Sequence, residues 1–82
     1  MKTWFEFSVQ DYMSPHPEIE YRSYDTKEEA EQYAHSMSKS AWSGSVTLIG
    51  VADPEKLLAF AKEVEADSEI IEEIISWSKS LR

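Results

Sequence analysis

Apolar and polar positions alternate strictly at the start of the chain. Over residues 3–11, TWFEFSVQD, the side chains of Phe5, Phe7 and Val9 share one face, and Trp4 lies on the opposite, polar face. This period-two pattern is typical of a β-strand that buries one side and exposes the other. We therefore expect a half-buried strand here.

The alternation returns over residues 18–24, EIEYRSY. Ile19 and Tyr21 fall on one face of this second stretch, and Tyr24 falls on the other. Residues 12–17 contain two prolines, which cannot continue a strand. The two stretches together predict a hairpin with a longer-than-minimal loop, and we expect Ile19 and Tyr21 to join the apolar face.

Apolar spacing then changes to that of a helix. Thr26 and Glu29 form the capping-box pattern, and the apolar residues after them recur three and four positions apart, as on one face of a helix. Gly44 is expected near the helix end. Residues 43–52, SGSVTLIGVA, are apolar on both faces, which predicts a third, well-covered strand.

Residues 54–81 form either one helix or two. The helix starts clearly, because Asp53 can cap it and a proline fits its first turn. At about 100° per residue, the later apolar stripe is rotated by about 90° from the earlier one. Asp67 and Ser68 are both good N-cap residues. We therefore expect a break near residues 66–68.

The order of elements is ββαβαα, which predicts a single α+β domain over residues 1–82. We expect a three-stranded, mainly antiparallel sheet in strand order 2-1-3, with the helices packed on one face. The crossover from the second strand to the third should be right-handed, as such connections nearly always are.

Charge and composition narrow the choice of function. Sixteen acidic residues against eight basic ones give a net charge of −8. This charge opposes direct binding to nucleic acid and to anionic membranes, and it permits a partner protein with a basic surface. The chain has no cysteine, no signal-peptide pattern and no apolar run long enough to span a membrane, so we expect a cytoplasmic protein.

Residue patterns that support catalysis are missing. The histidines, His16 and His35, are not paired at metal-ligand spacing, and no serine sits in a G-x-S-x-G turn. Two glycines cannot build a phosphate-binding loop. We therefore expect no enzymatic activity, no cofactor and no metal ion.

Residues 63–78, EVEADSEIIEEIISWS, are rich in acids and contain no basic residue. On a helical projection Glu69, Glu72 and Glu73 lie opposite the isoleucine stripe. One interpretation is a solvated face near a helix start, where acids favour the helix dipole. The other is a partner surface whose acids imitate a nucleic-acid backbone.

Aromatic residues at polar positions give a second clue. Trp4 and Tyr24 share the face that helices on one side would leave open. Trp42 points away from its helix stripe unless the helix has already ended there, and Trp77 lies at the edge of the last stripe. Tryptophan and tyrosine anchor protein interfaces more often than other residues do. The competing interpretation is that they complete a small core.

These observations predict a non-catalytic, acidic protein-binding module. It would act as a small inhibitor, of the kind phages direct against host defence, that occupies a basic, nucleic-acid-binding surface of a larger protein. Two alternatives stay open, which are a structural homodimer and a small-ligand binder with an aromatic pocket near Tyr12, His16 and Trp42. The candidate partner-binding residues are Trp4, Tyr12, Met13, His16, Tyr24, Trp42, Glu65, Glu69, Glu72, Glu73 and Trp77.

Overall fold

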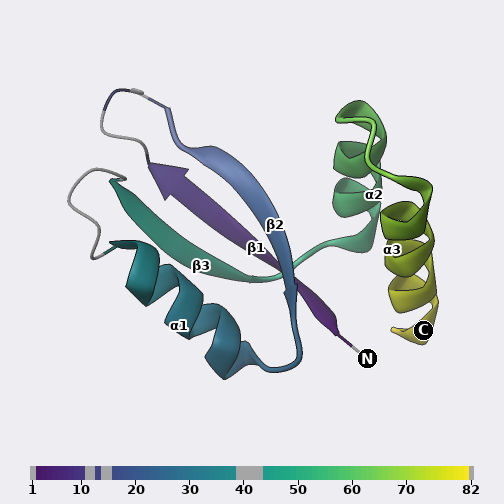
Figure 1. Ribbon diagram of the computed structural model, residues 1–82, viewed down its shortest axis with the longest axis horizontal. Helices are drawn as coiled ribbons and strands as arrows, with labels where there is room; N and C mark the ends of the chain where they lie inside the picture. Colours follow the sequence, from purple (N-terminus) through teal and green to yellow (C-terminus); the bar gives the residue numbers. More distant parts are fainter. Residues whose placement is uncertain (1, 11–12, 14–15, 39–43, 82) are drawn as a thin grey trace.

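Three strands and three helices make up the part of the chain that this computed structural model describes, which is residues 2–10, 13, 16–38 and 44–81 (Figure 1). In chain order the elements are β1 (Thr3–Gln10), β2 (Glu18–Tyr24), α1 (Lys27–Ser38), β3 (Ser45–Val51), α2 (Pro54–Glu63) and α3 (Ser68–Ser80). The predicted α+β class and the order ββαβαα are confirmed.

The strands form one antiparallel sheet in the order β2-β1-β3, as the sequence predicted. β1 lies in the centre, and its pairing with β3 shifts register between Glu6 and Phe7. Glu6 lies opposite Gly50 and Phe7 opposite Leu48, so Ile49 is an extra residue in β3. Gly50 adopts a φ of 153° beside this bulge, a conformation that residues with a side chain rarely take.

The pairing of β1 with β2 corrects one expectation about the faces of the sheet. Phe7 lies opposite Glu20, and Thr3 lies opposite Tyr24. Tyr24 therefore shares the apolar face of Phe7, whereas Tyr21 shares the face of Trp4. The predicted assignment of β2 was wrong, because alternation within each strand does not fix the register between strands, and a shift of one residue exchanges both faces.

α1 packs along the face of the sheet that carries Phe5 and Phe7. Ala30 and Ala34 are buried against these rings and against Val46. The helix begins as predicted, because the hydroxyl of Thr26 accepts a 3.2 Å hydrogen bond from the backbone N–H of Glu29. The expected helical layer on one face of the sheet is therefore supplied by α1.

α2 and α3 pack against each other, away from α1 and beside the N-terminal end of β1 (Figure 1). Their buried residues form a second core, against which Trp4 and Tyr21 pack. These two side chains come from the face opposite α1. Helical cover is thus divided between the two sides of the sheet, whereas all the helices were expected on one face. The residues buried in this second core are Ala52, Leu57, Ala61, Ile74 and Trp77.

The predicted break between two C-terminal helices is confirmed. Glu65 adopts the left-handed conformation with a φ of 56°, and its N–H donates to Lys62 O at 3.2 Å. The N–H of Ala66 donates to Ala61 O at 2.9 Å. This pair of hydrogen bonds is the Schellman motif, which ends a helix and satisfies its last carbonyl groups.

Candidate protein-binding surface

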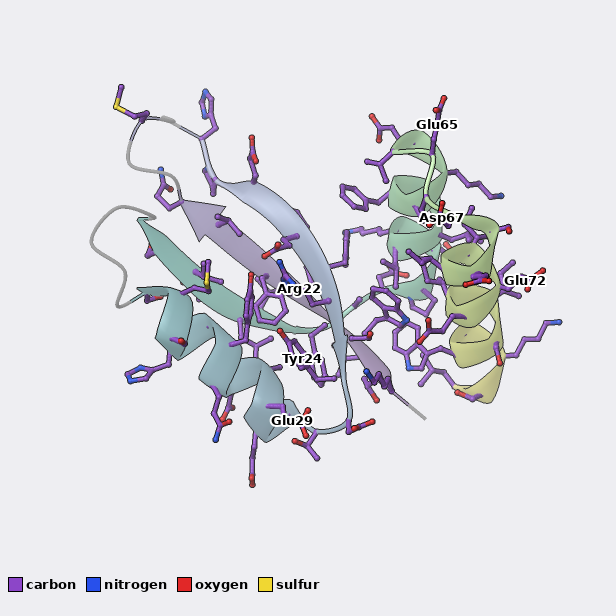
Figure 2. All side chains as sticks on the ribbon, in the orientation of Figure 1. Arg22, Tyr24, Glu29, Glu65, Asp67 and Glu72 are labelled. Atoms are coloured by element: carbon purple, nitrogen blue, oxygen red, sulfur yellow. The ribbon has the colours of Figure 1, made fainter. Side chains whose placement is uncertain are left out.

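Acidic side chains gather on the turn between α2 and α3 and on the outer side of α3. Glu65 and Asp67 lie at the turn, and Glu72 points away from the sheet (Figure 2). Glu69 and Glu73 are exposed as well. We call these five residues the acidic surface. They include all four glutamates that the sequence predicted for partner binding.

Within the described residues, no salt bridge involves the acidic surface. The ion pair that the described residues form lies elsewhere, on β2, where Arg22 Nη2 is 2.9 Å from Glu20 Oε1. The nearest basic residues along the chain are Lys62 and Lys79, each in the last turn of its own helix. A cation there complements the negative end of the helix dipole. The acidic surface therefore keeps its negative potential toward solvent.

An apolar groove of about 180 Å³ opens beside the α2–α3 turn. Its rim is open to solvent, since Val64 is 56% exposed and Ile70 is 39% exposed. Sequence reasoning missed this groove, because its residues come from two strands and two helices. The residues lining it are Trp4, Tyr21, Leu57, Phe60, Ala61, Val64, Ala66, Ile70 and Ile74.

Trp4 lines this groove and is not on an open sheet face. It lies on the side of the sheet opposite α1, as predicted, but the α2–α3 core covers much of it. Its indole Nε1 is buried and has no acceptor among the described residues. An unpaired buried donor costs about 1–3 kcal/mol. Trp4 therefore lies on the expected face of the sheet, but that face is partly covered at this position.

Further acidic groups lie near Tyr21, which lines the same groove. Its ring packs on Phe60 of α2 with the ring centroids 5.2 Å apart. Burial raises the pKa of Tyr21, and the nearby carboxylates of Glu6 and Asp53 raise it further. Negative charge therefore borders the groove on the side of the sheet as well as at the helix turn.

Tyr24 belongs to the core beneath α1. Its ring lies 6.4 Å from that of Phe7 and 5.9 Å from that of Tyr33, measured between centroids. Trp77 is only 3% exposed and lies in the α2–α3 core. Trp77 is therefore not available to a partner, and the partly buried ring of Tyr24 is packed against the core rather than lying on an open face.

Met13 and His16 do not join the acidic surface. Met13 is 84% exposed and His16 is exposed. Both lie beyond the C-terminal end of β1, whereas Trp4 lies near its start. Tyr12 and Trp42 fall outside the described residues. The aromatic pocket predicted near Tyr12, His16 and Trp42 therefore stays a prediction.

A second hollow, of about 360 Å³, runs over β2. Glu18, Glu20 and Arg22 contribute to its lining, and the last two are already paired with each other. In the described part of the chain, no cluster of three or more histidine, aspartate or glutamate residues is placed to hold a metal ion. No helix there is both long enough and apolar enough to cross a membrane.

No protein-family model matches this chain, and comparisons with curated proteins and with solved structures return no match either. The acidic surface and the groove beside it are the features of this chain that bear on its function.

Proposed function

We propose that this chain is a non-catalytic, acidic protein-binding module that docks its α2–α3 side onto a basic surface of a larger protein. The basic surface is one that binds nucleic acid, so the module acts as an inhibitor, as phage anti-defence proteins do. The observation that supports this most directly is the acidic surface. Its five carboxylates are exposed and, within the described residues, have no salt-bridge partner.

Exposed charges of one sign raise the rate at which a protein meets a partner of opposite sign. A surface that binds nucleic acid is rich in lysine and arginine, because it must neutralise phosphates. Exposed carboxylates on α3 and on the turn before it can pair with the same lysines and arginines as those phosphates. The association should therefore weaken as salt concentration rises.

Two features of these acidic residues lower the stability of the fold, which supports a functional role for them. Glu69 and Glu73 are four residues apart on one helix, and such a like-charge pair costs a few tenths of a kcal/mol. Glu65 holds a left-handed conformation that glycine adopts more readily. Sequences tend to break local rules of this kind where function requires it.

The test compares two triple charge reversals. The first is Glu69→Lys, Glu72→Lys and Glu73→Lys on the acidic surface. The second is Glu18→Lys, Glu28→Lys and Glu31→Lys, which changes the net charge equally at exposed positions on β2 and α1. Circular dichroism and thermal melting establish that both variants fold.

Quantitative pull-down from cell extract then compares both variants with the wild type. Proteins captured by the wild type should be lost with the acidic-surface variant, be retained by the control variant, and be released by added DNA or RNA. If the acidic-surface variant captures the same proteins as the wild type, the proposal fails.

A homodimer is the second candidate. β2 and β3 are both edge strands, and the β3 side chains of Ile49 and Val51 are more than half exposed. An exposed edge can pair with the same edge of a second copy. Sedimentation velocity at micromolar concentration separates the two candidate functions, because a strictly monomeric protein would exclude the homodimer.

A further inference from the structure

We infer that the apolar groove beside the α2–α3 turn receives one large apolar side chain from a partner segment that carries lysine or arginine on both sides of it. This inference rests on the proposed function and adds the chemistry of the partner. It would make the groove the centre of the interface and the surrounding acids its rim.

The size of the groove fits one such side chain. An apolar cavity of about 150 Å³ in a protein core can hold a benzene ring, and this groove measures about 180 Å³. A buried aromatic or aliphatic anchor that fills a pocket supplies much of the binding energy in many protein interfaces. The groove can therefore hold the side chain of a phenylalanine, tryptophan or leucine.

The rim of the groove exposes apolar area that docking would bury. Phe60 lies on α2, Val64 directly follows the end of α2, and Ile70 lies on α3; all three line the groove. Their exposed fractions are 37%, 56% and 39%. Neighbouring exposed apolar side chains with polar groups around them mark interaction sites.

Charge decides which occupant fits best. Glu65 and Asp67 adjoin the groove residues Val64 and Ala66 in the chain, and Lys62 adjoins Ala61. Glu6 and Asp53 are close enough to the groove residue Tyr21 to raise its pKa, so the acids around the groove outnumber the bases. A second copy of this chain would bring another net charge of −8 to the same rim. A neutral small molecule would leave the rim unpaired. A partner segment with basic flanks satisfies both the groove and its rim.

Trp4 gives the docking segment a specific polar contact. Its Nε1 donor is buried beside the groove without an acceptor in the described residues. Every residue of a bound segment carries a backbone carbonyl oxygen, which is a suitable acceptor. A small adjustment of the indole ring on binding would let one of these oxygens pair with it.

The experiment is a selection from a random peptide display library against the full chain. The enriched peptides should share one large apolar residue flanked by lysine or arginine. In ¹H–¹⁵N spectra, the indole N–H signal of Trp4 should move on titration with a selected peptide. Enrichment of neutral or acidic peptides, or of no motif, would overturn the inference.

Two matched variants then locate the binding site. Val64→Gln with Ile70→Gln changes the groove rim, and Ile49→Gln with Val51→Gln removes comparably exposed apolar groups from β3. The groove variant should bind the selected peptide about tenfold more weakly or worse, and the β3 variant should bind it normally. Equal binding by both variants would overturn the inference.

The charge-reversal variant separates this inference from the proposed function. If Glu69→Lys, Glu72→Lys and Glu73→Lys abolishes protein capture while the groove variant captures normally, the acidic surface is confirmed and the groove is excluded. If the groove variant alone loses binding, the anchor is confirmed and the proposed role of the acidic surface fails.

Discussion

The phenol of Tyr33 on α1 donates a 2.8 Å hydrogen bond to Oε2 of Glu20 on β2. The other carboxylate oxygen of Glu20 pairs with Arg22, whose guanidinium carbon lies 4.5 Å from the centroid of the Tyr33 ring. This partly buried group of three side chains joins α1 to an edge strand. It accounts for Glu20 and Arg22, which the sequence placed on the open face of the sheet but which lie on the face beneath α1.

Removing the Tyr33 hydroxyl tests how much its hydrogen bond to Glu20 contributes to the stability of the fold. Tyr33→Phe should lower the free energy of unfolding by about 1 kcal/mol or slightly more, because the acceptor is a partly buried carboxylate. Urea denaturation measures the change. Tyr24→Phe is the control, since the described residues offer its hydroxyl no hydrogen-bond partner, and it should change stability much less. Equal losses in the two variants would contradict this assignment.

The tyrosines also set the response to alkaline pH. Burial raises the pKa values of Tyr21, Tyr24 and Tyr33 above the ordinary value of 10.0. The folded protein therefore holds these protons more tightly than the unfolded chain does. Their contribution to stability is complete below about pH 10 and is lost as the pH rises through the raised pKa values.

Melting temperatures measured from about pH 8 to about pH 11 check this dependence. The temperature should be nearly constant at first and should then fall steeply. Tyr33→Phe should make the fall shallower, because one of the three groups no longer titrates. A profile that stays flat to the highest pH would be inconsistent with raised pKa values.

Local sequence signals predicted most of the architecture. The order of elements, the hairpin, and the break near residues 66–68 all follow from periodicity and from capping residues within one segment. The N-cap is an example, since Asp53 Oδ1 accepts a 3.0 Å hydrogen bond from the N–H of Glu55 as expected. Signals of this kind act over a few residues and can be identified without knowing the fold.

Relationships between segments could not be predicted in the same way. The position of Tyr24 depends on how β2 aligns with β1, and the alternation within each strand is equally compatible with two registers. The groove beside Trp4 depends on where α2 and α3 pack after their turn. Both features come from tertiary packing, so aromatic residues at polar positions were a misleading sign of exposure.

Ser38 provides a test of how the β3 edge is protected. Its hydroxyl donates to Val46 O at 2.9 Å and accepts from Val46 N–H at 3.0 Å. One side chain at the end of α1 thus satisfies both backbone groups that Val46 turns away from β1. Ser38→Ala should cost about 1 kcal/mol, because both of these groups lose their partner.

Ser36→Ala is the matched control, because Ser36 is an exposed residue of the same helix and alanine favours helix formation. It should leave stability unchanged or raise it slightly. Hydrogen exchange at the Val46 amide should also become faster in Ser38→Ala alone. A Val46 amide that stays equally protected would show that the hydroxyl is not its main partner.

Glu65 connects stability with the proposed function. It occupies the left-handed position of the Schellman motif with a φ of 56°, where glycine avoids the steric cost of a side chain. Glu65→Gly should therefore raise the free energy of unfolding by up to about 1 kcal/mol, whereas Glu65→Ala should not, because alanine keeps that cost. Urea denaturation of both variants measures the difference.

Binding should change in the opposite direction to stability. Both variants remove one carboxylate from the acidic surface, so both should bind a selected basic peptide more weakly than the wild type does. Glu65→Gly should then combine higher stability with lower affinity. Higher stability with unchanged affinity would assign this glutamate no part in binding. Equal stabilisation by alanine would instead mean that charge repulsion, not backbone conformation, is the local cost.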